Sequence, residues 1–255
     1  MKYLVTGVKY VLLILVTLIS LIPFVMMICM STHTTFEINR GMIYTIGDAL
    51  MENIQTLSQT SYGTYYFNSF YIAVVSTLLS LLISCLCGYG LAVYRFKLRK
   101  LFFTIIMATM MVPTQVGMIG FIMEMRALGL NNTHIPVIFY AVAWPFGVFW
   151  VRQFAQKAIP VDCLESARLE GCGEWRIFFS IGIPFLLPAI ASLSMIAFIT
   201  SWNAFLMPMM VLNDASLYTL QLGIRALGDA FHRDIAAQIA GLSLGVVPIL
   251  LVFKS

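Results

Sequence analysis

Six long apolar stretches constrain the fold of this chain more than any other feature of its sequence. They run approximately over residues 10–30, 67–94, 101–123, 135–154, 183–212 and 235–253. A hydrocarbon layer about 30 Å thick is crossed by roughly 20 helical residues, whose backbone polar groups all bond within the helix. The stretches contain no Asp, Glu or Lys, and their one arginine, Arg152, lies near an end. The sequence predicts an all-α polytopic membrane protein with six transmembrane helices.

Composition supports a single membrane domain over residues 1–255. Hydrophobic residues make up 60% of the chain and charged residues 10%, whereas soluble domains average about 25% charged. This excludes a soluble enzyme. The net charge of +4 is too small and too scattered to indicate a nucleic-acid partner. The five cysteines form no C-x-x-C pair, and we interpret them as unpaired packing residues.

The distribution of Lys and Arg predicts the orientation, because short loops rich in these residues stay in the cytoplasm. If both termini and the loops after the second and fourth helices share one side, that side has 11 of the 15 basic residues. These are Lys2, Lys9, Arg95, Lys97, Arg99, Lys100, Arg152, Lys157, Arg168, Arg176 and Lys254. Both termini are therefore expected in the cytoplasm. Loops at about 31–66, 124–134 and 213–234, which include Asp229 and Arg233, are expected outside.

Residues for catalysis or cofactor binding are hard to find. No lysine follows a glycine, so the chain lacks a phosphate-binding loop for ATP. His33, His134 and His232 fall in outer loops without metal-ligand spacing, and we interpret them as inert surface residues. We expect no catalytic residue, metal or cofactor in this chain. ATP and Mg²⁺ would be bound by partner subunits.

Some residues at membrane depth could serve packing or a solute pathway. Gly241 and Gly245 are spaced for close helix packing, either within the chain or with a partner. The amide of Asn203 needs several hydrogen-bond partners, so it should cap a helix break or line a polar cavity. Aromatic, amide and hydroxyl groups suit sugar binding, although the same residues also anchor helix ends at the membrane interface. The candidate pathway residues are Tyr140, Trp144, Trp202 and Asn203.

One cytoplasmic segment, residues 160–184, has the pattern of a short helix followed by a turn. Asp162 can cap a helix over about 162–170, with Glu165 completing a capping box. Gly171 can adopt the left-handed conformation that ends it. Leu164, Ala167 and Arg168 would share one face. A short helix of this kind outside the bilayer is suited to docking a partner.

These residues resemble the E-A-A-x-x-x-G motif of ABC-importer permeases, followed after nine residues by I-x-L-P. Ser166 and Ile183 are mild departures from the motif. Residues 202–208, WNAFLMP, are similar to a segment of maltose-type sugar permeases. The resemblance implies a type I ABC-importer permease fold, with the loop helix as the coupling helix. The implied ATPase-coupling residues are Asp162, Glu165, Ser166, Ala167, Arg168, Glu170 and Gly171.

The resemblance also implies the chain's partners. They are a second permease subunit, two cytoplasmic ATP-binding subunits, an extracellular or periplasmic solute-binding protein and the lipid of a bacterial cell membrane. The expected function is permeation of a sugar or oligosaccharide, and glycerol phosphate or another small polar solute remains an alternative. A membrane-embedded enzyme and a channel or receptor are the other classes considered, and neither requires a co-purifying ATPase.

Overall fold

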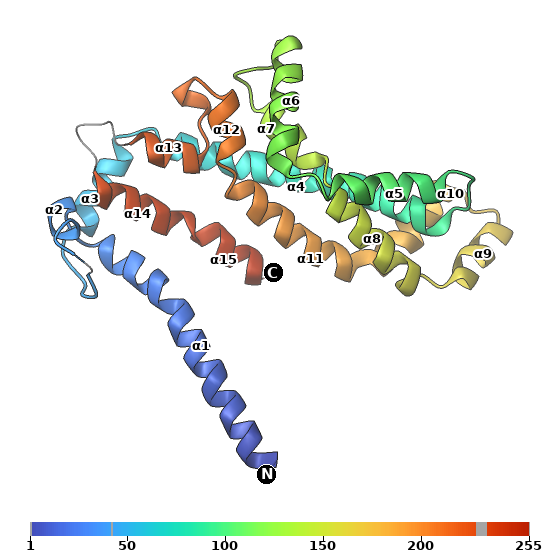
Figure 1. Ribbon diagram of the computed structural model, residues 1–255, viewed down its shortest axis with the longest axis horizontal. Coiled ribbons are helices and arrows are strands. Elements are labelled where there is room, and N and C mark those ends of the chain that lie inside the picture. Colours follow the sequence, from blue (N-terminus) through green and yellow to red (C-terminus); the bar gives the residue numbers. More distant parts are fainter. Residues whose placement is uncertain (1, 42, 228–233, 255) are drawn as a thin grey trace. The chain divides into compact units, whose positions relative to one another are not determined.

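The structure is a computed structural model that describes residues 2–41, 43–227 and 234–254 (Figure 1). Asp229, His232 and Arg233, named above, lie outside the described residues. All regular structure in these ranges is helical, which confirms the predicted fold class. The helices are α1 (Lys2–Met30), α2 (Thr35–Ile38), α3 (Leu50–Ser58), α4 (Tyr62–Val93), α5 (Arg99–Thr109), α6 (Thr114–Ala127), α7 (Ile135–Val142), α8 (Pro145–Ala158), α9 (Val161–Leu169), α10 (Glu174–Ile177), the π-helix η1 (Phe178–Gly182), α11 (Ile183–Trp202), α12 (Leu206–Val211), the 3-10 helix η2 (Ala215–Leu217), α13 (Leu220–Ala226), α14 (Ile235–Gly245) and α15 (Val247–Lys254).

Five runs of helix in the described residues are long and apolar enough to cross a membrane. They are Thr6–Met30, Tyr62–Val93, Ile135–Ala158, Glu174–Trp202 and Ile235–Val252. The pair α5 and α6 is also apolar enough, but it bends by 99° at a short break, so the total is six if this pair counts as one broken span.

Several predicted boundaries were wrong. The third stretch is not a straight helix, because Pro113 lies at the break between α5 and α6 and has no N–H to continue the hydrogen-bond ladder. The fifth span begins at Glu174, not residue 183, and ends at Trp202, so residues 206–211 form a separate helix. The second begins at Tyr62, inside the segment expected to be an outer loop.

The chain divides into two compact units, which we describe separately: residues 1–66 with 220–255, and residues 67–219. In the first unit, α14 packs against α3 (Figure 1). The Tyr62 hydroxyl donates a hydrogen bond to the Gly241 carbonyl over 2.9 Å, and a Cβ at Gly241 would lie 3.1 Å from the Tyr62 ring. A Cβ at Gly245 would lie 3.1 Å from Leu220. The small-residue face of α14 therefore packs within its own chain.

The loop after α1 is fastened by buried polar groups. His33 is buried, and its Nδ1 lies 3.0 Å from the carbonyl oxygen of Cys29. The Asn53 amide donates to the carbonyls of Ser31 and His33. The expectation that His33 is an inert surface residue was therefore wrong, because its ring completes the end of α1. His134, in the second unit, likewise contacts the carbonyl oxygen of Leu217 at 2.9 Å.

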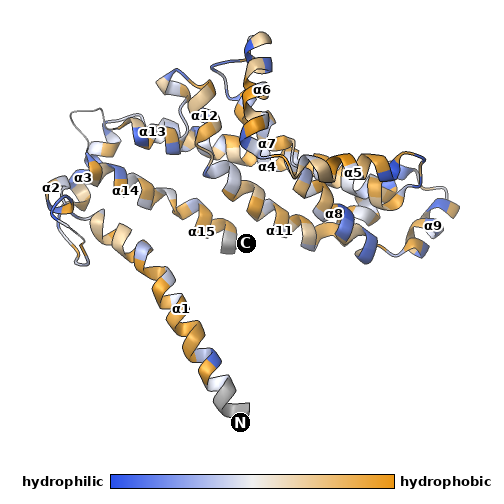
Figure 2. Cartoon of the chain, in the orientation of Figure 1, coloured by the Kyte–Doolittle hydropathy of each residue, from blue (hydrophilic) through white to orange (hydrophobic). Residues whose placement is uncertain are grey.

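Helix α1 is predominantly apolar from residue 10 to residue 30 (Figure 2). None of the most apolar part of Thr6–Met30 is buried within the chain. A helix that is hydrophobic all round is stable only where its surroundings are apolar. This helix therefore has the character of a lipid-facing or subunit-facing span.

The second unit is built on close packing among α4, α8 and α11. Gly88 and Gly147 permit this, since a Cβ at Gly88 would lie 2.7 Å from Val151 and one at Gly147 would overlap Ser84. Pro145 has no N–H for the Ala141 carbonyl one turn earlier, and the hydroxyl of Ser80 donates to that oxygen over 2.8 Å. The break between α7 and α8 thus keeps its backbone satisfied at membrane depth.

Candidate functional site

The short helix α9 and the turn that follows it form the candidate site. α9 spans Val161–Leu169, close to the expected helix. Its N-cap is Pro160, and no side chain caps it. The predicted capping box of Asp162 and Glu165 was therefore wrong: the N-cap lies two residues earlier, which moves Asp162 into the first turn. There the carboxylate still opposes the positive end of the helix dipole.

The end of α9 is a Schellman turn centred on Gly171. Gly171 has φ of +80°, in the left-handed region that favours glycine. The Cys172 amide donates to the Ala167 carbonyl, and the Gly171 amide donates to that of Arg168, both over 3.0 Å. These two bonds satisfy carbonyls that the helix end would leave unpaired.

One face of α9 is fixed to the core and the other is open. Leu164 and Ala167 are buried in a cluster with residues of α4, α8 and α11, including Tyr89. Leu169, by contrast, is 90% exposed. The polar and charged residues Asp162, Glu165, Ser166, Arg168 and Glu170 are also exposed, as is Cys163. The helix thus presents charges and one large apolar side chain from a rigid base.

A carboxylate beyond the turn ties α9 to two spans. Glu174, the first residue of α10, pairs with Arg168 through Nε–Oε1 at 2.7 Å and Nη2–Oε2 at 3.2 Å. The Tyr94 hydroxyl, just after α4, donates to Glu174 Oε2 over 2.8 Å. Burial and this bond raise the pKa of Tyr94 to about 12, and the bond to Glu174 raises the pKa of Arg168. Both groups therefore stay protonated near neutral pH, and the network persists there.

The start of the fifth span contains a π turn. The Ile183 amide donates to the Phe178 carbonyl, five residues back, and Pro184 follows. The wider turn accommodates a proline whose ring would otherwise meet the carbonyl one turn earlier. Gly182 packs on the buried Tyr89 ring, where a Cβ would lie 2.8 Å from Cε2. The Tyr89 and Phe178 ring centres are 5.0 Å apart. This segment is consequently packed firmly onto α4.

The predicted pathway residues have separate structural environments. Tyr140 donates its hydroxyl to the Thr114 carbonyl at the start of α6 over 2.7 Å, and Trp144 packs on Phe146 at the start of α8. Trp202 is 1% exposed and stacks on Phe198. Asn203 caps the C-terminus of α11, where its side chain is exposed. Asn203 thus lies at a helix break, as expected, and the pathway assignment stays a prediction.

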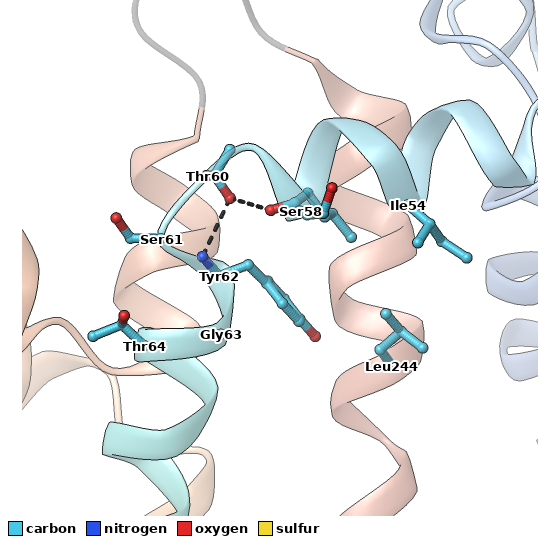
Figure 3. A pocket seen from close by; sticks show the side chains of 9 residues that line it. Ile54, Ser58, Thr60, Ser61, Tyr62, Gly63, Thr64 and Leu244 are labelled. Atoms are coloured by element: carbon cyan, nitrogen blue, oxygen red, sulfur yellow. Dashed lines mark hydrogen bonds between the residues drawn. The ribbon is translucent and has the colours of Figure 1, made fainter.

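A surface groove of about 410 Å³ lies in the first unit, between the end of α3, the start of α4 and Leu244 (Figure 3). Its polar groups are engaged locally: Thr60 Oγ1 donates to the Leu57 carbonyl and accepts from the Tyr62 amide. None of the predicted pathway residues lines it. We therefore assign no binding role to this groove.

Sequence reasoning did not find Glu174 or Tyr89 as parts of the site. The Arg168–Glu174 pair crosses a left-handed turn, so the residues do not have the spacing of neighbours on one helix. The only available signal was the acid Glu174, two residues before Arg176 and close to the start of an apolar run. The cysteines were only partly as expected, since Cys29 and Cys85 are buried whereas Cys87 and Cys163 are exposed.

This arrangement of apolar spans with a rigid helix between two of them is the fold of an ABC-importer permease. The structure matches one chain of a bacterial ABC transporter involved in the import of the acidic polysaccharide alginate, with a TM-score of 0.84 and 22% identity. The match covers 98% of this chain and 94% of the other.

Sequence comparisons assign the family. Residues 80–254 match the model of the binding-protein-dependent transport system inner membrane component. The lactose transport system permease protein LacG of Rhizobium radiobacter is 38% identical, over 96% of this chain and 90% of its own length. The arabinooligosaccharides transport system permease protein AraQ of Halalkalibacterium halodurans is 33% identical, over 93% of this chain and 87% of its own length. The sn-glycerol-3-phosphate transport system permease protein UgpE of Yersinia enterocolitica is 31% identical, over 86% of this chain and 80% of its own length. The chain belongs to this family of inner-membrane transport components.

Proposed function

We propose that this chain is one of two permease subunits of an ATP-driven importer for a sugar or oligosaccharide. The family supports the importer, and the names of LacG and AraQ support the solute class. A second permease would complete the pathway, an external binding protein would deliver the solute, and two ATPases would drive alternating access. UgpE, a glycerol-phosphate permease, keeps that solute class as the alternative.

The observation that carries the coupling proposal is the two-faced character of α9. Leu164 and Ala167 anchor it in the core of the second unit, while Leu169 and Glu170 project outward. The exposed face of α9, with Leu169 between Arg168 and Glu170, is open to a protein partner. Motion of a docked ATPase would reach α4 and α11 through the buried side chains and through Glu174. This proposal places α9 and both termini in the cytoplasm.

The function is tested by reconstitution. The chain would be co-expressed with its cognate permease, ATPase and binding protein, and the purified assembly placed in proteoliposomes. We expect ATP-dependent uptake of a disaccharide or larger oligosaccharide, with ATP hydrolysis stimulated by the loaded binding protein. Uptake of glycerol 3-phosphate instead would reassign the solute class. Purification without any ATPase would contradict the importer function itself.

A further inference from the structure

Two arginines from different helices converge beside the first turn of α5. Arg99 begins α5 and Arg152 lies in α8. The side-chain amide of Gln156 is oriented so that its oxygen faces both guanidinium groups. In this orientation Gln156 Oε1 accepts hydrogen bonds from Arg99 Nη2 over 3.1 Å and from Arg152 Nη2 over 3.3 Å. The Arg152 guanidinium also lies over the Phe103 ring, with its Cζ 3.7 Å from the ring centre. Two positive groups thus share one neutral oxygen, in a position set by packing.

The charge of this pair is not neutralised in the part of the chain that the structure describes. No carboxylate oxygen there lies within 4.0 Å of either guanidinium, and the ion pair present is that of Arg168 with Glu174. Arg99 also donates to the Ala92 carbonyl over 3.1 Å, and the Arg152 Nε–H is shielded without an acceptor. The bonds named use only part of the ten N–H donors of two guanidinium groups. An anion would relieve the repulsion and accept from the remaining donors.

The surroundings favour an anion further. No side chain caps the N-terminus of α5, and the exposed Lys97 and Lys100 flank it. The first turn of a helix attracts negative charge because its amides point outward and the dipole is positive there. The two arginines therefore lie at a helix N-terminus, with two exposed lysines close to it in the sequence.

The apolar surface next to the pair indicates which anion. Helix α5 has no buried residue, and Leu101, Phe102 and Ile105 are each about half exposed. A soluble phosphate would leave this surface uncovered, whereas a phospholipid has both a charged headgroup and acyl chains. We propose that Arg99 and Arg152 bind the phosphate of an anionic phospholipid whose acyl chains lie along α5. Basic sites between membrane helices bind such headgroups in general. This goes beyond the transport function and does not depend on the transported solute.

The test is native mass spectrometry of the purified importer, titrated with phosphatidylglycerol or with phosphatidylcholine. For the double variant Arg99→Gln/Arg152→Gln we expect phosphatidylglycerol to bind roughly 30-fold more weakly at one site. Phosphatidylcholine binding should not change. The matched control is Arg126→Gln/Arg176→Gln, which removes two exposed cations from α6 and α10 and should bind phosphatidylglycerol like the wild type. Equal affinity of the wild type and the Arg99/Arg152 variant would overturn the proposal.

A second variant tests whether the guanidinium geometry matters, and a competitor tests whether the site prefers a soluble anion. Arg99→Lys/Arg152→Lys keeps both charges but loses the planar fork of donors, so its affinity should lie between those of the wild type and the Gln variant. If the Gln variant does not assemble, wild-type affinity in the Lys variant would by itself contradict the assignment. Inorganic phosphate at millimolar concentration should not displace the lipid; displacement would indicate a soluble-anion site and overturn the proposal. Loss of the second permease with unchanged lipid binding would assign the pair to a subunit interface and overturn it as well.

Discussion

Arg168 and Glu174 form a two-point ion pair across the turn at Gly171, with Nε–Oε1 at 2.7 Å and Nη2–Oε2 at 3.2 Å. The pair links the last turn of α9 to the first residue of the fifth span. Since Tyr94 donates to the same carboxylate, one acid also connects α9 to the end of α4. Both partners are more than one-third exposed, so the pair adds little to stability, and its importance lies in positioning.

The first prediction concerns this pair. Arg168→Gln and Glu174→Gln should each lower solute-stimulated ATP hydrolysis by about fivefold or less, because an exposed ion pair contributes about 0.2–1 kcal/mol. The double variant should be no worse than either single variant, since both remove one interaction. Strictly additive losses would show that the two residues act independently. Tyr94→Phe should give a smaller loss.

Gly171 is the second test. Valine at φ of +80° has a steric penalty of about 1–2 kcal/mol, which would displace the end of α9. We expect Gly171→Val to lose bound ATPase on purification, and Gly171→Asn to retain more, because Asn tolerates this conformation better. Gly173→Ala is the matched control, since Gly173 has φ of −68° and open space around it. Normal ATPase retention in Gly171→Val would contradict the coupling role of the turn.

Glu165 provides a test in which the structure changes the expectation. A capping box would make Glu165→Ala cost about 0.5–2 kcal/mol of helix stability, but α9 has no side-chain cap and Glu165 is exposed. The thermal midpoint of the purified assembly should therefore stay the same while ATPase affinity falls. A lowered midpoint with unchanged affinity would mean that Glu165 acts in folding and not in docking.

Topology is tested with native and introduced thiols. Cys163 on α9 is exposed, and Leu128, in an expected outer loop, is 67% exposed. In chains that keep only one such thiol, an impermeant maleimide added to intact cells should label Leu128→Cys and not Cys163. Asn132 would be a poor reporter, because its side chain accepts from the Asn213 and Asp214 amides and its φ is 59°. The opposite labelling pattern would invert the proposed orientation.

The sequence predicted the helical class and the approximate positions of the apolar spans, because lipid imposes length and hydropathy together. Pro113 is a sequence signal for a break in the third stretch, but neither it nor hydropathy gives the 99° angle between α5 and α6. The sequence also placed the start of the fifth span nine residues late. Glu174 and Arg176 lower local hydropathy there, yet both fit at a helix end where charged groups reach the interface.

For the candidate site, spacing predicted the turn at Gly171 and a common face for Leu164, Ala167 and Arg168. Leu164 and Ala167 are buried, whereas Arg168 is exposed. Spacing did not predict the partners of Arg168, because Glu174 and Tyr94 reach it only after the chain has turned. Trp202, a candidate for solute contact, is buried and stacked on Phe198, and its place in the pathway stays a prediction. Aromatic residues near helix ends serve packing and binding equally well in a sequence pattern, and burial distinguishes them only in three dimensions.

A photo-crosslink tests whether α9 docks on an ATPase subunit. A benzophenone maleimide on Cys163, in an assembly whose other cysteines are replaced by alanine, would be irradiated with and without ATP. We expect a covalent product with the ATPase subunit that is absent when the probe is on Leu128→Cys. A Cys163 product with the external binding protein, or with lipid alone while the ATPase remains bound, would contradict this docking.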